Sequence, residues 1–407
     1  MRILLVHQNF PGQFKHIVPA LLARGDEVVA MGMGNYAPPA GMRYARSQPR
    51  MGTGRDGHPW SRDFDTKVIR GEATFRSAMN LRESGFTPDV IIAHPGWGES
   101  LFLHTVWPTA KIGLYCEFFY RADGADTNFD PEFPTLQPEE QAARLFVKNA
   151  GNYLSFQHAT RFISPTYWQA ASYPEWIQPR ITVIHDGIDT LDVRPNPDVS
   201  IRLPNGRNVT RADEVITFVA RNLEPYRGYH KMMRALPDLM TLRPNAHFIL
   251  VGGDGTSYGA APPAGQSWKQ MYLDEVIGRI DQERLHFVGH IPYPTFKALL
   301  TLSRVHIYLT VPFVLSWSLL EAMASGCAIV ASHTPPVREL ITPGVHGQLV
   351  SFHDVDELVA AVAALSNDAD RRHSLGKNAR DRIVQEYDLR TVCLPRQLAW
   401  IDELGRA

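Results

Sequence analysis

The sequence has few cysteines, and nothing in it suggests that they pair or hold a metal. Its 407 residues contain only Cys116, Cys327 and Cys393, which lie far apart. An odd number of isolated cysteines argues against a disulfide framework, and the lack of a Cys-x-x-Cys pair or a histidine cluster argues against a zinc site. We therefore expect three reduced cysteines and no bound metal.

Long apolar runs and an excess of charge are missing as well. No run reaches the roughly 18 residues that a membrane-spanning helix needs. The apolar segment that begins at Ile3 is too short for a signal peptide and has no small-residue cleavage site after it. The net charge is only -1, whereas general binding to nucleic acid requires a strong basic excess. These absences predict a cytoplasmic protein that does not bind nucleic acid.

The length and composition indicate a globular protein of two domains. Hydrophobic residues make up 44% and charged residues 20% of the chain, and its length suits two domains of roughly 150 to 200 residues each. Apolar runs alternate with helical patterns in both halves, which is typical of doubly wound parallel sheets. The polar segment 192–211 reads as the connection. We predict an α/β protein with one domain at residues 1–200, completed by the C-terminal helix 389–407, and another at 201–388.

Buried strands are expected where apolar, β-branched runs are short and bounded by turn residues. In the first half they lie at residues 2–6, 27–31, 89–93, 111–115, 161–163 and 181–184, and in the second at 215–220, 247–251, 285–288, 305–309 and 327–331. Helices are expected at residues 13–24, 138–158, 229–242 and 389–404. The pattern between residues 42 and 82 is irregular, and no element is assigned there.

The segment from Arg43 to Arg82 is locally basic. It holds nine basic and four acidic residues, a charge of +5, with Trp60, Phe64 and Phe75 interleaved. A surface that meets an anionic acceptor or an anionic membrane has this composition. A solvated loop and helix would have it too, and the sequence leaves both interpretations open.

Candidate site residues of the first half follow expected strands, because ligands of doubly wound sheets lie outside the carboxyl ends of the strands. Gly12 opens a helix, where a missing side chain lets a ligand approach main-chain N–H groups. His94 stands in a Pro-Gly-Trp-Gly loop, and we expect it to contact a ligand, although a lone histidine is more often structural. The Glu117 carboxylate suits sugar hydroxyls, and the aromatic residues beside it, among them Tyr120, suit sugar faces. An aromatic patch that packs between domains would look the same. The connection at residues 7–14, between the first expected strand and helix, lacks the Gly-x-Gly-x-x-Gly signature that nicotinamide and flavin enzymes have at this place.

In the second half, the stretch from Phe313 to Gly326 follows a buried strand. Ser316 and Ser318 can cap a helix there, and the preceding loop lacks acidic residues, so free N–H groups would face a site suited to an anion. Glu321, about one turn into the helix, could accept hydrogen bonds from a hydroxylated ligand. A buried crossover with a surface glutamate would give the same pattern.

Two arginines flank the turn that follows the first strand of the second half. Arg221 and Arg227 are six positions apart, and two guanidinium groups can clamp a diphosphate bidentately. The alternative is an exposed loop with two solvated arginines. The place of the loop at a strand end favours the clamp.

These motifs resemble the retaining family 4 glycosyltransferases of the GT-B fold. The similarity extends over essentially the whole chain and is carried by residues 319–330, 221–228 and 289–291 and by Glu339, Gly344 and Gly347. It implies two doubly wound, Rossmann-like domains facing a central cleft. The donor, a nucleoside-diphosphate sugar, would be held by the C-terminal domain and the acceptor by the N-terminal one.

The resemblance also implies a role for each candidate residue. Glu321 would hold the ribose hydroxyls, and Arg221 with Arg227 would neutralise the leaving diphosphate. His94 would bond the hexose near the reacting carbon. Further donor contacts are implied for Gly12, Gly289, His290, Ile291, Phe313, Ser316 and Trp317. Because fixed cations and N–H dipoles can stabilise the leaving group, no metal and no cofactor is expected.

Two positions depart from the family pattern. Arg227 stands where the family usually has lysine, which keeps the charge and changes the geometry. Phe313 stands eight positions before Glu321, where the family usually has a glutamate that contacts the donor hexose. Phe313 could form an apolar wall beside the sugar, or it could point into the core while Glu117 supplies the missing carboxylate.

We therefore predict a retaining, metal-independent hexosyltransferase that acts in polysaccharide or glycolipid biosynthesis. Its acceptor would be a saccharide or a lipid-linked molecule, with peripheral contact to the inner, anionic membrane face. A sugar-nucleotide epimerase of the same fold is the first alternative. A non-catalytic sugar-nucleotide-binding protein, suggested by Phe313, is the second.

Overall fold

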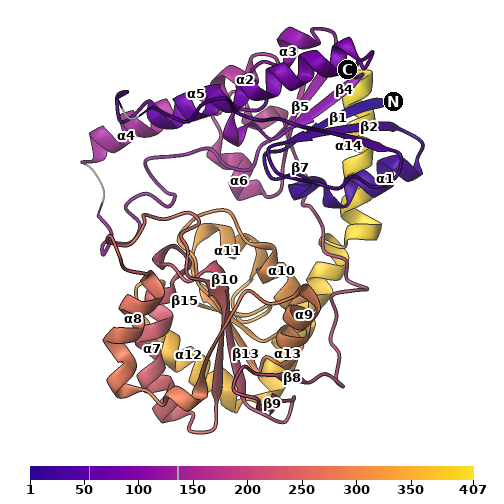
Figure 1. Cartoon of the computed structure of the whole chain (residues 1–407). Helices are drawn as coiled ribbons and strands as arrows, with labels where there is room; N and C mark the ends of the chain where they lie inside the picture. Colours follow the sequence, from indigo (N-terminus) through magenta and orange to yellow (C-terminus); the bar gives the residue numbers. More distant parts are fainter. Residues whose placement is uncertain (55, 135–136) are drawn as a thin grey trace. The chain divides into compact units, whose positions relative to one another are not determined.

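The structure, a computed structural model, describes residues 1–54, 56–134 and 137–407 and divides them into two compact units (Figure 1). Unit 1 comprises Met1–Thr127, Pro134–Gly187 and Leu389–Ala407; unit 2 comprises Asn128–Phe133 and Ile188–Asp388. The sequence put the division at residue 200. In the structure, residues 188–200 pack with unit 2, and so does the short segment Asn128–Phe133.

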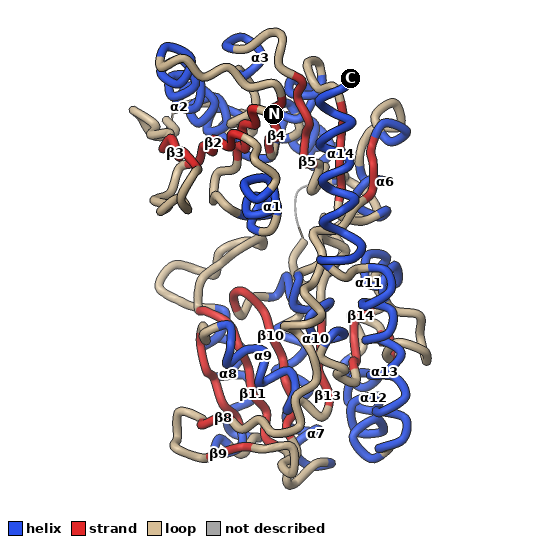
Figure 2. Tube along the Cα trace, turned by 90° about the vertical axis from the view of Figure 1, so that its right-hand side faces the viewer, coloured by secondary structure: helices blue, strands red, loops and turns tan. Residues whose placement is uncertain are grey.

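Unit 1 is built on a seven-stranded sheet in the order β3-β2-β1-β4-β5-β6-β7, with all neighbours parallel. The strands are β1 (Arg2–Val6), β2 (Glu27–Gly32), β3 (Met42–Arg46), β4 (Val90–Ala93), β5 (Lys111–Tyr115), β6 (Arg161–Ser164) and β7 (Ile181–Val183). The helices are α1 (Ile17–Ala23), α2 (Arg62–Glu83), α3 (Leu103–Val106), α4 (Pro138–Lys148), α5 (Ala150–Phe156), α6 (Tyr167–Ser172) and α14 (Leu394–Arg406). Helices lie on both sides of the sheet (Figure 2).

The strands of unit 1 are apolar on both faces because both faces are covered. Successive side chains of β1 enter two different clusters: Leu4 and Val6 pack with α2, α3 and α5, whereas Ile3 and Leu5 pack with α1 and α14. Helix α14 comes from the end of the chain (yellow in Figure 1) and lies close to β5. A side chain at Gly113 would come within 2.5 Å of the Trp400 ring.

Helix α2 fills the region where the sequence showed no regular pattern. It has 22 residues, and its charged residues mask a buried face that includes Ile69, Ala73 and Ala78. Lys67 belongs to that face, is 6% exposed, and donates to the main-chain oxygen of Lys148. Lys67 is therefore not part of a basic surface, and Arg55, also counted in the +5, lies outside the described residues.

Unit 2 is built on a six-stranded parallel sheet in the order β12-β11-β10-β13-β14-β15. Its strands are β10 (Val215–Asn222), β11 (His247–Gly253), β12 (Leu285–Gly289), β13 (Val305–Tyr308), β14 (Ile329–Ser332) and β15 (Gln348–Val350). The helices are α7 (Tyr229–Leu242), α8 (Trp268–Val276), α9 (Tyr293–Leu302), α10 (Trp317–Ala324), α11 (Pro335–Leu340), α12 (Val355–Asn367) and α13 (Ala369–Glu386). A two-stranded antiparallel ribbon, β8 (Ile201–Arg202) with β9 (Asn208–Val209), precedes them in the expected connection.

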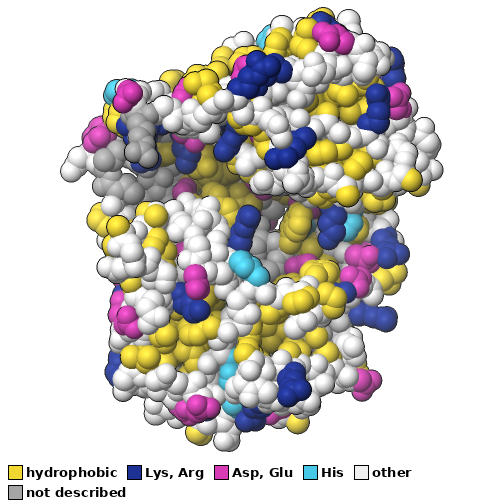
Figure 3. All heavy atoms as spheres, viewed as in Figure 1, with side chains coloured by type: hydrophobic (Ala, Val, Ile, Leu, Met, Phe, Trp, Pro, Cys, Tyr) yellow, Lys and Arg dark blue, Asp and Glu magenta, His cyan; other side chains and the backbone are white. Residues whose placement is uncertain are grey.

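Other sequence features appear as expected. Cys116, Cys327 and Cys393 are buried, and none of them forms a disulfide within residues 1–54, 56–134 and 137–407. No helix of the described residues is both long and apolar enough to cross a membrane. On the face drawn in Figure 3, basic and acidic side chains are mingled, in keeping with a net charge of -1.

Candidate active site

The order of strands reverses once in each sheet, between β1 and β4 in unit 1 and between β10 and β13 in unit 2. The connections that leave such neighbouring strands run to opposite faces of the sheet, and the crevice outside their carboxyl ends is where doubly wound folds bind ligands. The predicted residues Gly12 and His94 follow β1 and β4, and Arg227 and Ser316 follow β10 and β13. Each unit thus has candidate residues at its switch point, the place where the strand order reverses.

In unit 1, His94 is held by two hydrogen bonds. Its Nδ1 accepts from the main-chain N–H of Gly96 at 3.1 Å, which places the ring proton of the neutral form on Nε2. Nε2 lies 3.2 Å from a carboxylate oxygen of Glu117. The ring also stacks on Trp97, with centroids 4.3 Å apart. His94 is 4% exposed, so both its tautomer and its orientation are fixed by this loop.

Glu117 is the acceptor at the centre of this group. Its other oxygen accepts from the side-chain amide of Gln13 at 2.8 Å. Burial by itself would raise the pKa of Glu117, but the hydrogen bond and the charge of His94 outweigh it and hold that pKa below its ordinary value. Glu117 is thus an ionised, partly exposed carboxylate beside a histidine N–H.

His7 completes the group and was not singled out from the sequence. Its ring lies edge-on to His94 with centroids 5.3 Å apart, and its Nδ1 accepts from the N–H of Asn9 at 3.0 Å. Burial first, and then the nearby His94, lower the pKa of His7 to about 3, so it stays neutral. The His7 ring accounts for the glycine at position 12. The φ of Gly12 is +48°, and a side chain there would come within 2.5 Å of the His7 ring. The signal in the sequence was its position directly after β1.

Tyr120 is less exposed to ligand than the sequence suggested. The ammonium of Lys148 lies 3.5 Å from the centre of its ring, and its main-chain N–H and C=O bond the side chain of Asn149. Burial raises the pKa of Tyr120. Local contacts thus account for the position of the Tyr120 ring. Acceptor binding by Tyr120 stays a prediction.

In unit 2, Arg227 and Arg221 have different environments. Arg227 is 6% exposed, and its guanidinium donates to the Thr310 hydroxyl at 2.8 Å and to the Val314 carbonyl at 3.0 Å. Arg221 is exposed, and its main-chain oxygen lies 2.9 Å from Nε2 of His290. The hypothesis of two solvated arginines is wrong for Arg227, because the loop between β13 and α10 fixes its guanidinium.

Phe313 belongs to an aromatic cluster around Arg227. It is 8% exposed, and its ring centroid lies 5.0 Å from Tyr226 and 5.2 Å from Tyr258. The guanidinium carbon of Arg227 lies 5.1 Å from the centre of the Tyr258 ring and 5.8 Å from that of Phe313. The position that carries a glutamate in the resembling family thus packs on an arginine in this chain.

Glu224 organises the same loop and was missed in the sequence. It is 1% exposed, and its carboxylate accepts from the main-chain N–H groups of Ser257, Tyr258 and Gly259 at 3.1 to 3.4 Å. This ties the loop after β10 to the glycine-rich loop after β11. The pairing spans 33 residues, so no local pattern predicts it.

Helix α10 presents the other predicted donor residues. Ser316 precedes its first residue but does not cap it: the hydroxyl bonds that of Ser318, and the Ser316 N–H donates to the Tyr308 hydroxyl at 3.1 Å. Glu321 accepts from the Tyr293 hydroxyl at 2.7 Å. Trp317 is 39% exposed.

The run Gly289-His290-Ile291 lies at the end of β12, two strands from β10. Gly289 has φ +62°, which favours glycine, and nothing lies within 4 Å of where its side chain would be. His290 packs closely on Gly253, where a side chain would come within 2.5 Å of its ring. These residues therefore border the loops after β10 and β11.

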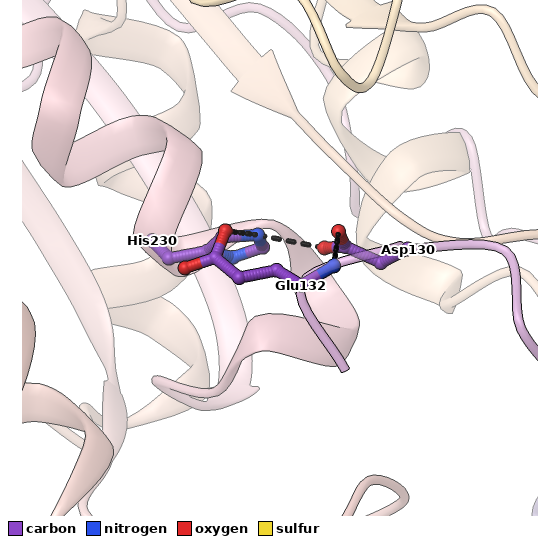
Figure 4. Close-up of side chains that lie close together, drawn as sticks. All are labelled: Asp130, Glu132 and His230. Atoms are coloured by element: carbon purple, nitrogen blue, oxygen red, sulfur yellow. Dashed lines mark hydrogen bonds and ion pairs between the residues drawn. The ribbon is translucent and has the colours of Figure 1, made fainter. Parts of the chain in front are cut away.

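A separate group, Asp130, Glu132 and His230, has the spacing of a metal site, with ligand atoms within 4.8 Å of one another (Figure 4). Nε2 of His230 lies 2.8 Å from Asp130, and Arg234 donates to both oxygens of Glu132 at 2.8 and 2.7 Å. Each carboxylate thus already has a donor. The group anchors the segment Asn128–Phe133 to α7.

Two family models match this chain. The family model described as "Glycosyl transferase family 4 group" matches residues 24–193, and the one described as "Glycosyl transferases group 1" matches residues 205–382. The chain is a glycosyltransferase of the GT-B fold, group 1. A glycogen synthase of Mycobacterium tuberculosis is 23% identical over 96% of this chain and 92% of its own length.

Two solved structures share the fold of this glycosyltransferase. The sucrose-phosphate synthase from Thermosynechococcus elongatus has a TM-score of 0.71 and 17% identity, and the Anabaena protein Alr3699/HepE, in complex with UDP and glucose, has a TM-score of 0.67 and 18% identity. Both matches cover 100% of each chain. The predicted GT-B fold is confirmed.

Proposed function

We propose that this glycosyltransferase is a retaining, metal-independent enzyme that moves a hexose from a nucleoside-diphosphate sugar to a saccharide or a lipid-linked acceptor. The observation that carries the proposal is the fixed guanidinium of Arg227 in the loop after β10, next to the loop from β13 to α10. Such a cation, held before the substrate arrives, is suited to a diphosphate.

Breaking the bond between the sugar and the phosphate builds negative charge on the diphosphate. Arg227 needs little rearrangement to meet that charge, because Thr310 and Val314 already hold its guanidinium. Arg221, which is exposed near the end of β10, would approach from the start of the same loop. Electrostatic stabilisation of this kind often contributes more to catalysis than any other single effect, and it is why we propose that no metal is needed.

The remaining donor contacts follow from α10 and β12. The carboxylate of Glu321 would accept hydrogen bonds from the ribose, oriented by the hydroxyl of Tyr293. Gly289, which leaves open space at the end of β12, would let the base lie close to the backbone. These contacts bind the nucleotide equally before and during the reaction, so they contribute mainly to affinity.

Unit 1 would supply contacts to sugar hydroxyls. Glu117 is an ionised acceptor, and His94 presents an N–H to it. A hydroxyl that inserts between them would accept from His94 and donate to Glu117. The 3.2 Å separation is long for a charge-assisted hydrogen bond, which suits such an exchange.

The donor sugar is proposed from relatives. A glycogen synthase matches nearly the whole chain, and a protein of the same fold binds UDP and glucose. UDP-glucose is therefore the first donor to test. GDP-mannose tests the alternative base and sugar.

Sugar-nucleotide turnover with and without added acceptor tests the proposal. The protein is incubated with UDP-glucose or GDP-mannose, alone, with a glucan, or with a lipid extract, with EDTA present throughout. Release of nucleoside diphosphate that requires the acceptor, with an α-linked product by NMR, is expected. Turnover without acceptor to an epimerised sugar indicates an epimerase, and binding without turnover indicates a non-catalytic protein; either result overturns the proposal.

We also propose that the basic part of unit 1 meets an anionic acceptor or membrane. Arg46, Arg50 and Arg76 line a hollow of about 310 Å³ beside α2. Co-sedimentation with phosphatidylglycerol vesicles is expected, and it should weaken with salt as charges are screened. Arg50→Gln should reduce it more than Arg121→Gln, a matched exposed arginine of unit 1. Equal recovery with neutral phosphatidylcholine vesicles would refute this contact.

A further inference from the structure

Unit 2 has a hollow at the amino ends of its strands, at the opposite end of the sheet from Arg227. Its volume is about 510 Å³, and it is lined by residues just before β10, β13 and β14 and by one face of α13. In a parallel sheet the amino ends of all strands lie at the same end of the sheet. This pocket therefore lies away from the carboxyl ends of the strands, where the candidate donor residues are. A volume between about 300 and 1000 Å³ is typical of small-molecule sites.

Positive charge dominates the lining of this pocket. The charged side chains are Arg211, Arg304, Arg372, Lys377, Arg380 and Asp213. Five lysines and arginines thus line the pocket with one aspartate. Two of the five have carboxylate partners outside the lining, since Lys377 lies 2.6 Å from Asp381 and Arg304 lies 3.9 Å from Glu214. Such a concentration of like charge is unfavourable unless something offsets it.

Two of these arginines are fixed by main-chain oxygens. The guanidinium of Arg380 donates to the carbonyls of Thr190, Val193 and Ala324, and that of Arg372 to those of Leu365 and Ser366. Neutral carbonyls hold the guanidinium groups in place but leave their charge in full. No ion pair within 4 Å joins either arginine to a carboxylate among the described residues.

The pKa values agree with an excess of positive charge. Burial first, and then the neighbouring Arg304, lower the pKa of Arg372. Burial and Arg194 lower that of Arg380. An anion in the pocket would relieve both effects, since an opposite charge nearby favours the charged form of an arginine.

A buried hydroxyl without a partner also lines the pocket. Ser325 is 5% exposed, and its Oγ has no hydrogen-bond partner among residues 1–54, 56–134 and 137–407. Leaving a buried hydroxyl unsatisfied costs about 1 to 3 kcal/mol. The floor beside it is closed by main chain, because a side chain at Gly376 would come within 2.2 Å of the carbonyl oxygen of Gly326. Ser325 is placed to donate to a ligand.

We infer that this pocket binds a small molecule bearing phosphate groups, separate from the sugar-nucleotide substrate. Arginines with fixed guanidinium groups recognise phosphate oxygens through paired N–H donors. Ser325 supplies an additional hydroxyl donor, and Lys377 and Arg211, on the exposed rim, contribute charge. The single carboxylate, Asp213, leaves room for a ligand with two or more negative charges.

Pyrophosphate is the probe, because it carries two phosphate groups and no sugar or base. Its affinity for the full chain is measured by calorimetry at constant ionic strength. The test variant is Arg211→Gln with Lys377→Gln, both at exposed lining residues. The matched control is Arg279→Gln with Arg371→Gln, which removes the same charge from exposed positions of unit 2 outside the pocket.

The test variant is expected to bind pyrophosphate at least tenfold more weakly than wild type, and the control less than twofold. Hydrogen exchange locates the site, since pyrophosphate could also bind near Arg227. Protection of residues 369–380 and 325–328 supports the pocket, whether or not residues 221–228 are protected as well. Protection confined to residues 221–228, equal affinities of the two variants, or no binding by wild type at millimolar pyrophosphate overturns it.

Discussion

The loop after β4 in unit 1 and the loop after β10 in unit 2 each bury a glutamate, and the two glutamates differ in their partners. Glu224 in unit 2 and Glu99 in unit 1 are both 1% exposed. The oxygens of Glu224 accept from three main-chain N–H groups, whereas those of Glu99 have no partner among the described residues. Burial accordingly raises the pKa of Glu99 to about 7.

The difference shows how one topology supports two kinds of site. In unit 2 the carboxylate serves as an anchor that fixes the loop of Arg221 and Arg227, so that positive charge is presented outside the sheet. In unit 1 the loop presents the His94 N–H to the Glu117 carboxylate, which follows β5, and the buried acid Glu99 stays unsatisfied. The switch point determines where side chains gather, and the loop residues determine their chemistry.

The largest effect on turnover is expected from removing the fixed guanidinium of Arg227 in unit 2. Arg227→Ala should lower turnover at saturating donor by about 100- to 1000-fold, because it removes a group that stabilises charge built up in the transition state. Arg221→Ala should have a smaller effect in the same direction, since Arg221 is exposed. Steady-state kinetics with calorimetry of the bare nucleoside diphosphate separates turnover from binding.

Arg227→Lys and Arg279→Ala are the controls. The lysine keeps the charge but loses the bonds to Thr310 and Val314, so intermediate activity is expected. Arg279 is an exposed arginine of unit 2, and its loss should leave turnover unchanged. A folded Arg227→Ala protein with wild-type turnover at saturating donor would disprove the clamp.

The unsatisfied acid of unit 1 predicts a pH dependence of stability. The pKa of Glu99 is raised from 4.5 to about 7 in the folded state, so folding takes up a proton between these values. The free energy of unfolding should be highest below pH 4.5 and fall as the pH rises toward 7, by up to about 3 kcal/mol.

Urea unfolding of wild type and Glu99→Gln, measured from pH 5 to 8, isolates this contribution. The difference in unfolding free energy between the two proteins should shift in favour of the glutamine variant as the pH rises. Glu224→Gln, at the satisfied position, should show no such shift toward the variant. A difference that is flat with pH would mean that Glu99 is ionised in the folded protein.

Removing the proposed ribose acceptor should affect binding more than turnover. Glu321→Ala is expected to weaken binding of the bare nucleoside diphosphate by about tenfold, which is the effect of losing a hydrogen bond to a charged group. Turnover at saturating donor should change much less, in contrast to Arg227→Ala. Tyr293→Phe removes only the partner of Glu321 and should have a smaller effect. Calorimetry that finds unchanged affinity would remove Glu321 from the nucleotide site.

The smallest effect is expected on the choice of sugar. Phe313 packs on Tyr226, Tyr258 and Arg227, and an apolar wall discriminates between sugars by only about 1 to 3 kcal/mol. Phe313→Glu should alter the ratio of kcat/KM values for UDP-glucose and GDP-mannose in a protein that still folds. A large drop in melting temperature without any change in that ratio would make Phe313 a core residue only.

The sequence predicted most of the fold because buried parallel strands have a local signature. Short apolar, β-branched runs placed nearly every strand of the two sheets within a few residues, and α7 has the predicted bounds, 229–242. The short edge strands β3 and β15 were not assigned. Helix α2 was not predicted, because its charged residues interrupt the apolar pattern. Lys67 within it is buried by contacts with distant residues.

The sequence alone determined that His94, Glu117 and Arg227 follow strand ends and that Glu321 lies in the helix after β13. Their partners were decided only by the tertiary structure. Gln13 meets Glu117 across 104 residues, and Arg227 meets Thr310 across 83. These contacts depend on strand order and loop closure, which no local pattern encodes. Burial of His7, Glu99 and Phe313, and hence their charge or packing, likewise follows from segments far away in the chain.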